Sequence, residues 1–281
     1  MAGASMKDIK LRIKSVESTM QITKAMQLVA TSKLRRAKER MEGSKPYAVI
    51  SREAMMAAAA SCTDQTVPYV TEREVRRRCY VVIAGDRGLA GGYNNNVFKA
   101  VHADSEAMSC CVLPLGRKAV EHFHRRGLPM LSEEFVRVEG MGVSSCYRLA
   151  KLLIAGYDSG EYDEVVLAYT SFQSMLSQEV RLERLLPIDK PEKPETATVS
   201  TVYEPSAAEV LRKAMPDFLA GRLYSAVCDA YVSEVASRRT AMDSATKNAG
   251  EMISGLRLSY NRARQGAITQ EITEIVAGAE Q

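Results

Sequence analysis

Residues 80–96, YVVIAGDRGLAGGYNNN, join an apolar run to a glycine-rich segment and then to a predicted helix start. Many α/β enzymes hold phosphate groups at such a place. Four glycines fall in this segment: Gly85, Gly88, Gly91 and Gly92. Their spacing differs from the G-x-G-x-x-G fingerprint, and a P-loop is excluded because no lysine occurs between residues 74 and 98. Three interpretations stay open: an anion site, a tight surface turn whose glycines supply positive φ, and a loop that docks a partner.

The histidines form no recognisable metal site. His122 and His124 lie two residues apart near a predicted helix end, beside Arg125 and Arg126, and no third ligand is placed. We expect these side chains to be solvated, and we expect His102 at a surface helix position. No G-x-S-x-G, H-E-x-x-H or protein kinase motif occurs. The sequence therefore predicts no catalytic residue, no metal and no cofactor.

Composition narrows the class of protein. The 281 residues carry a net charge of +4 and six cysteines that show no C-x-x-C spacing, so we expect reduced thiols in a reducing compartment. No signal peptide is seen, and no apolar run is long enough to span a membrane, so we expect no membrane-spanning segment. The basic run at residues 33–40 lacks interleaved aromatic residues. It favours a solvated face, or a face toward an acidic protein loop, over nucleic-acid binding.

The elements that must position the glycine loop lie in a central zone, residues 75–200. Strand and helix signals alternate there. The predicted strands are 79–84, 110–115, 129–136, 164–170 and 180–186, and the predicted helices are 94–108, 117–126 and 144–157. This alternation predicts a Rossmann-like α/β domain with a mainly parallel sheet, followed by a proline-rich linker.

Long helices are predicted on both sides of this domain, over residues 1–62 and 206–281. Apolar and small residues step by four and three in each. The N-terminal series is Ile9, Ile13, Val16, Met20, Thr23, Gln27, Ala30, Leu34, Ala37 and Met41; the C-terminal series is Tyr231, Val235, Arg238, Met242, Ala245, Ala249, Met252, Leu256, Ser259 and Ala263. These heptad seams predict a coiled coil, which must be antiparallel if the helices pair near the domain. Pro46 predicts a bend or fault in the first helix, and Pro216 a kink or restart in the second.

The longer C-terminal helix is expected to extend beyond its partner. The overhanging segment, 263–281, carries an apolar stripe. The stripe consists of Ile268, Ile272, Ile275, Val276 and Ala279. An unpaired helix with such a stripe is marginal in water, so we expect another protein to surround it.

Three stretches carry a resemblance to a known family. They are SVESTMQITKAMQLVATSKLRRAKERM (15–41), GDRGLAGGYN (85–94) and YNRARQGAITQEITEIVAGA (260–279). In this order and separation they resemble the gamma subunit of F-type ATP synthases. The resemblance implies a rotor whose terminal helices form an antiparallel coiled coil inside a ring of three alpha and three beta subunits. It further implies one copy per complex, with the central domain as a foot on the epsilon subunit and the membrane c-ring.

The resemblance also implies contact residues, and no active site in this subunit. Lys24, Ala25 and Met26 match the segment that faces an acidic loop of beta. Arg264 and Gln265 match a pair that hydrogen-bonds a second beta loop, and Thr269 and Glu271 follow on the same helix. The glycine loop, with Asp86, Arg87, Gly88, Gly91 and Gly92, then belongs to the foot rather than to a phosphate site. No cysteine-containing insertion of the chloroplast type is seen, which favours a bacterial protein at the cytoplasmic face of the cell membrane.

Arg238 occupies a seam position, where a buried charge is costly unless it is paired. It is either a polar lock or a side chain that reaches off the seam to water. Two other functions stay open for the whole chain. One is an α/β nucleotide-binding protein with a helical interaction arm, and the other is a basic coiled-coil scaffold for nucleic acid.

Overall fold

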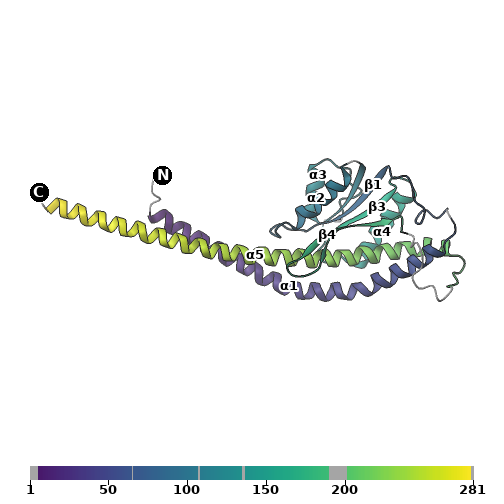
Figure 1. Cartoon of the computed structure of the whole chain (residues 1–281), viewed down its shortest axis with the longest axis horizontal. Helices are drawn as coiled ribbons and strands as arrows, with labels where there is room; N and C mark the ends of the chain where they lie inside the picture. Colours follow the sequence, from purple (N-terminus) through teal and green to yellow (C-terminus); the bar gives the residue numbers. More distant parts are fainter. Residues whose placement is uncertain (1–5, 65, 107, 135–136, 190–200, 280–281) are drawn as a thin grey trace. The chain divides into compact units, whose positions relative to one another are not determined.

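A computed structural model describes residues 6–64, 66–106, 108–134, 137–189 and 201–279 (Figure 1). The chain divides into two compact units, one of Met1–Thr31 with Arg238–Gln281 and the other of Ser32–Ser237. The elements in chain order are α1 (Met6–Ser61), β1 (Arg77–Ile83), α2 (Tyr93–Ser105), β2 (Ser109–Leu115), α3 (Arg117–Arg125), α4 (Val143–Asp158), β3 (Glu164–Phe172), β4 (Gln178–Leu186) and α5 (Ala207–Ala279). Both units contain parts of α1 and α5, and each unit is described separately.

The second unit is built on a four-stranded sheet in the order β2-β1-β3-β4. β1 pairs in parallel with β2 and β3, whereas β4 pairs antiparallel with β3. The mainly parallel sheet predicted from the sequence is therefore confirmed. Since the chain leaves β1 toward β2 on one side and later returns to β3 on the other, the loop after β1 lies at the switch point of the sheet.

Two apolar cores cover the two faces of this sheet. On one face, Val81, Leu113 and Leu167 pack with α4 and with the parts of α1 and α5 that belong to this unit. On the other face, Tyr80 and Val112 pack with α2 and α3. Alternate residues of β1 thus point into different cores, and both cores exclude water, as a sheet covered on both faces requires.

One predicted strand is wrong. Residues 129–136 were expected to form a strand, but in the described part of this segment only Met130 bridges to β2, at Val112. Residues 135 and 136 lie outside the described residues. The amide of Val112 donates to the carbonyl of Pro129, and the amide of Leu131 donates to the carbonyl of Val112. In the described residues, pairing at this edge of β2 is therefore limited to one bridge. The acidic residues that follow provide no further apolar side chains to pack beside β2.

The two prolines do not interrupt their helices. α1 continues through Pro46, and α5 continues through Pro216, so the predicted fault and restart are not found. Close packing inside the second unit accounts for this at Pro46. A side chain on Gly221 of α5 would meet the Tyr47 ring of α1 at 2.4 Å, so the two helices lie against each other immediately after the proline. Tertiary contact here outweighs the local helix-breaking tendency.

In the first unit, α1 and α5 run antiparallel. Hydrogen bonds join Thr23 to Thr246 at 2.8 Å and Gln27 to Asp243 at 2.9 Å, and Arg257 contacts Glu17 at 2.9 Å. Residue numbers rise along α1 while those of their partners fall along α5. The predicted antiparallel pairing is therefore confirmed within this unit, with a seam that is partly polar.

The seam of α5 differs from the prediction over its last turns. Met252 was expected inside but is 50% exposed, whereas Ile253 is buried. Ser259 is likewise exposed, and Tyr260 is half-buried. A straight α-helix advances slightly more than a strict heptad repeat allows, so the buried stripe drifts by one residue over several turns. In this register the side chain of Ile253 is buried, and the more flexible side chain of Met252 is left exposed.

Candidate functional site

The glycine loop begins with Gly85, whose backbone is hydrogen-bonded and closely packed. The amide of Gly85 donates to Asn94 Oδ1 at 2.8 Å, and its carbonyl accepts from the amide of Lys118 at 3.0 Å. A Cβ at this position would lie 2.8 Å from Oε1 of the buried Glu234 on α5. Gly85 is therefore a close-packing position between the sheet edge and α5, and it does not have positive φ.

The tip of the loop is a tight turn. Positive φ occurs at Gly91 (57°) and, unusually for a residue with a side chain, at Leu89 (63°). Leu89 is 65% exposed, and Arg87 and Gly88 are exposed beside it. The predicted role of glycine in supplying positive φ is thus confirmed for Gly91 only.

Backbone hydrogen bonds close the loop onto the start of α2. The amide of Tyr93 donates to the carbonyl of Ala90, and the amide of Asn96 donates to the carbonyl of Gly92. A phosphate cradle uses such amides for the ligand. Their internal use favours the interpretation of the loop as a packed turn over that of a nucleotide site.

A pocket of about 360 Å³ lies at the carboxyl ends of β1 and β2. Its lining residues are Asp86, Arg87, Arg117, Arg137 and Glu139. Both acids already have partners within the fold. Asp86 accepts the amides of Val138 and Glu139, and Glu139 accepts Lys33 Nζ at 2.5 Å and the Tyr231 hydroxyl at 3.0 Å. The bond from Lys33 is the main cause of the lowered pKa of Glu139.

These contacts tie the segment after residue 137 to the glycine loop, to α1 and to α5. The pocket lining mixes three guanidinium groups with two carboxylates and contains no serine, cysteine or histidine. Nucleophilic catalysis needs a nucleophile and a base within hydrogen-bond reach. The lining of this pocket does not supply that pair, and its two carboxylates are used in contacts within the fold.

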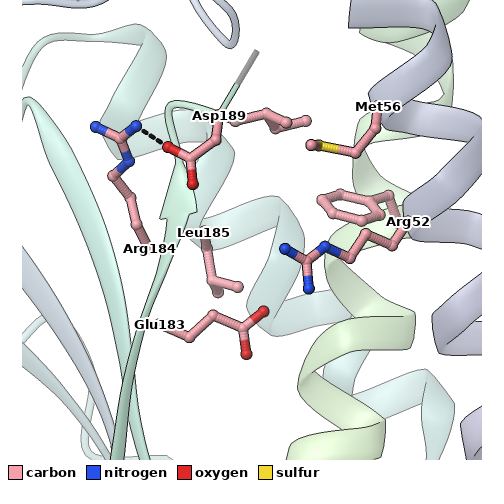
Figure 2. A pocket seen from close by; sticks show the side chains of 8 residues that line it. Arg52, Met56, Glu183, Arg184, Leu185 and Asp189 are labelled. Atoms are coloured by element: carbon pink, nitrogen blue, oxygen red, sulfur yellow. Dashed lines mark hydrogen bonds and ion pairs between the residues drawn. The ribbon is translucent and has the colours of Figure 1, made fainter. Parts of the chain in front are cut away.

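A second cavity lies between α1, α5 and β4 and is only about 30 Å³ (Figure 2). Arg184 is paired with Asp189 at its rim, and Figure 2 shows Arg52 and Glu183 directed toward one another across it. Glu183 is held from α5 by Arg222. A cavity of this size has room for about one water molecule, so it provides no ligand site.

The predicted contact residues on the long helices lie in the first unit. Lys24 and Ala25 of α1 are exposed and Met26 is half-buried, while Arg264, Gln265, Thr269 and Glu271 of α5 are all exposed. The structure does not bring the two groups together. Thr23 is level with Thr246, and Arg264 lies about 27 Å further along the axis of α5.

Apolar side chains accompany both groups on the surface. Ile22, Leu28 and Val29 of α1 are 58%, 64% and 57% exposed, which confirms the extra apolar width predicted around residues 22–30. On α5 the predicted stripe is exposed at Ile268, Ile272, Ile275 and Val276. The side chain of Ala279 is not among those described. Arg238 is half-buried.

The prediction from the sequence was wrong for two histidines. His102 and His122 were expected on the surface and in solvent, but both are half-buried and their Nε2 atoms lie 2.9 Å apart. They come from different helices, α2 and α3, and no sequence spacing connects them. His124 is exposed, as expected. In the described part of the chain, no group of three or more His, Cys, Asp or Glu side chains is placed to hold a metal ion.

The fold and its surfaces define a class of protein: an α/β domain combined with a pair of long helices that expose apolar and charged side chains. The family model described as ATP synthase matches residues 5–281. The ATP synthase gamma chain of Ruminococcus albus is 44% identical over 278 residues, covering 97% of this chain and 96% of that protein. The sodium ion specific gamma chain of Acetobacterium woodii is 38% identical, covering 98% of each.

A solved structure agrees with the fold. A chain of the Euglena gracilis mitochondrial ATP synthase, in an OSCP/F1/c-ring structure, aligns with a TM-score of 0.66 at 16% identity, covering 98% of this chain and 93% of that chain. The present chain belongs to the ATP synthase gamma-chain family.

Proposed function

We propose that this chain turns as a single copy inside a ring of three alpha and three beta ATP synthase subunits. In this proposal the α/β domain rests on the epsilon subunit and the c-ring, so that ion movement drives rotation and rotation drives ATP synthesis, or the reverse. The exposed apolar stripe of α5 is the main support, because isolated helices with such a stripe are marginal in water. A surrounding ring supplies the missing apolar contacts.

The proposed role is mechanical, and catalysis belongs to other subunits of the complex. Two helices that differ in length and in surface chemistry meet three identical neighbours through three different faces. Each face then favours a different conformation of the neighbour that it touches. By linkage, nucleotide binding to those neighbours exerts a corresponding bias on the rotor.

The two exposed groups on the helices are proposed as the contacts with the ring. Lys24, Ala25 and Met26 offer a cation beside the exposed Ile22 and Val29, which suits an acidic loop with an apolar flank. Arg264, Gln265, Thr269 and Glu271 offer hydrogen-bonding groups beside the apolar stripe of α5.

Arg238 is proposed as a third contact, either as a polar lock or as a side chain that reaches off the seam. The limits of the three segments, 1–62, 75–200 and 206–281, likewise stay predictions. They do not follow the two compact units, whose boundaries fall within α1 and α5.

The glycine loop is proposed as a partner contact of the foot. Its tip presents Arg87, Gly88 and Leu89 to solvent, and a non-glycine residue at positive φ is a strained conformation that is often kept for a functional reason. Gly91 and Gly92 shape this tip. Asp86 supports it from inside through its bonds to the amides of Val138 and Glu139.

A peripheral position at the cytoplasmic face of a bacterial cell membrane completes the proposal, with membrane contact only through the complex. No helix in the described residues is long and apolar enough to cross a membrane. Nucleic acid has no part in this function.

Native mass spectrometry of the complex tests the proposal. The chain is purified from its host with a tag on the α/β domain and weighed together with everything it carries. We expect one copy with three copies each of two larger subunits. A monomer or homo-oligomer that binds nucleotide with saturation would contradict the proposal and favour an α/β nucleotide-binding protein with a helical arm. Salt-sensitive binding of DNA or RNA would favour a nucleic-acid scaffold instead.

A further inference from the structure

Two of the three histidines of this protein form a pair on the α2–α3 face of the sheet. His102 lies in the last turn of α2, and His122 lies in α3. Their Nε2 atoms are 2.9 Å apart, so one ring donates its proton to the other. The proposed rotor function gives this pair no role.

The two histidine rings pack against two phenylalanine rings. Phe98 stacks on His122 with ring centroids 4.0 Å apart and planes 12° apart, and Phe123 contacts both histidine rings edge-on or tilted. Both phenylalanines belong to the buried core on this face of the sheet. Little side-chain freedom therefore remains to be lost when a ligand binds, and the two Nε2 atoms already lie 2.9 Å apart.

The rings are neutral at physiological pH. Burial lowers the pKa of both side chains, and that of His122 falls to about 4, with smaller contributions from His102, Arg125 and Arg126. A neutral imidazole has one nitrogen lone pair available for a ligand. In the pair one Nε2 carries the proton of its ring. When that proton moves to Nδ1 of the same ring, both Nε2 atoms offer a lone pair and both rings stay neutral.

The separation of the two nitrogens fits a single metal ion. Imidazole nitrogens bind such ions at about 2.0–2.1 Å, and two of them 90–109° apart are separated by about 2.9–3.4 Å. We propose that His102 and His122 together bind one divalent transition-metal ion of the imidazole-preferring class, such as Zn²⁺, Ni²⁺ or Cu²⁺. The ring that now carries its proton on Nε2 changes to the tautomer protonated on Nδ1, so the ion takes the place of the hydrogen bond and both rings stay neutral.

The expected affinity for the metal ion is limited by the presence of only two protein ligands and by two nearby arginines. Water completes the coordination, because no third His, Cys, Asp or Glu side chain joins the pair within the described residues. Arg125 and Arg126 lie close enough to lower the pKa of His122, and they oppose a cation in the same way. We therefore expect reversible binding in the micromolar range, stronger at neutral than at acidic pH.

Zinc titration of the full-length chain, labelled with ¹⁵N at histidine, tests this inference. Zn²⁺ is diamagnetic, and three histidines give few signals. We expect saturable one-to-one binding that shifts the Nε2 resonances of two histidines and leaves those of His124 unchanged. Since the ion joins α2 to α3, the midpoint of thermal unfolding should rise with Zn²⁺ concentration.

His102→Gln and His122→Gln should each weaken the affinity by ten-fold or more and abolish the thermal shift. His124→Gln is the matched control, and Cys110→Ser tests the half-buried thiol on the same side of the sheet; both should bind as the unchanged chain does. Because the resonance shifts are measured on the unchanged chain, the test does not depend on how the variants fold. Equal affinity in all variants, or no saturation below about 1 mM Zn²⁺, would overturn the inference.

Discussion

At the scale of single residues, two glycines lie at the carboxyl edge of the sheet where an added side chain would meet close neighbours of different kinds. Gly85 leaves room for the Glu234 carboxylate, whereas Gly116 leaves room for backbone. Gly116 has φ 94°, and a Cβ there would lie 2.2 Å from the carbonyl oxygen of Ala84. A side chain can move away but a strand carbonyl cannot, so Gly116 is the more demanding position.

We predict that Gly116→Ala destabilises the chain by about 2–4 kcal/mol, through positive φ together with the overlap on Ala84. Urea unfolding followed by circular dichroism measures the loss. Gly88→Ala is the control, because a Cβ at Gly88 meets nothing within 4 Å, and it should change stability by less than about 0.5 kcal/mol. Equal losses in the two variants would show that steric overlap is not the cause.

The histidine pair makes stability depend on pH. The pKa of His122 is lowered from 6.5 to about 4 in the folded chain, so the unfolded chain binds the proton first as pH falls. Stability is then complete above about pH 6.5 and declines toward pH 4. Since His122 is only half-buried, we expect this residue to contribute about 1–2 kcal/mol after solvent screening.

Thermal unfolding at pH 7.5 and pH 5.0, without added metal, measures this loss. His122→Gln should lose less stability than the unchanged chain between these two values, whereas His124→Gln should behave as the unchanged chain. An equal loss in all three proteins would assign the pH dependence to other groups. The interval stays above the range in which most carboxylates take up protons.

At the scale of elements, the antiparallel helix pair of the first unit is held by a seam of mixed character. Apolar Ile9, Ala30 and Ile253 share the seam with the polar pairs Thr23–Thr246 and Gln27–Asp243. Polar pairs within a seam fix the register at a cost in stability. The helices are thereby aligned without a continuous apolar interface.

The drift of the seam gives a direct comparison of two neighbouring residues. We predict that Ile253→Ala destabilises the chain by about 2–3 kcal/mol, whereas Met252→Ala costs less than about 1 kcal/mol, because Ile253 is 6% exposed and Met252 is 50% exposed. Urea unfolding of the full chain is the measurement. The opposite order would restore the strict heptad predicted from the sequence.

At the scale of the whole molecule, we expect the C-terminal end of α5 to contribute to function but little to the stability of the fold. The described side chains from Arg264 onward are mostly exposed and add little apolar burial. We predict that deletion of residues 264–281 shifts the midpoint of thermal unfolding of the isolated chain by less than about 2 °C. In the reconstituted complex the same deletion should reduce the torque and the coupling of ATP hydrolysis to ion pumping.

A variant of full length in which Ile272 and Ile275 are replaced by serine separates the loss of apolar contact from the loss of length. If apolar contact is what matters, this serine variant should lower torque almost as far as the deletion of residues 264–281 does. Unchanged torque after the deletion would show that the end of α5 has no role in rotation.

The sequence alone determined those features that repeat at short range. The four-and-three spacing placed both long helices, and alternating apolar runs placed β1 to β4 and α2 to α4 within a few residues. The failed glycine fingerprint already argued against a nucleotide site. The motif at 260–279 identified the family, because specific side chains on one helix face can be read without knowing the fold.

Only the tertiary structure decided which distant residues meet. It brought His102 to His122, placed Gly85 against Glu234, and carried α1 through Pro46. It also selected Ile253 over Met252 and, in the described part of 129–136, reduced the expected strand to one bridge. Each of these outcomes rests on packing between segments far apart in the chain. Such energies exceed local preferences of about 1 kcal/mol per residue, and no local pattern records them.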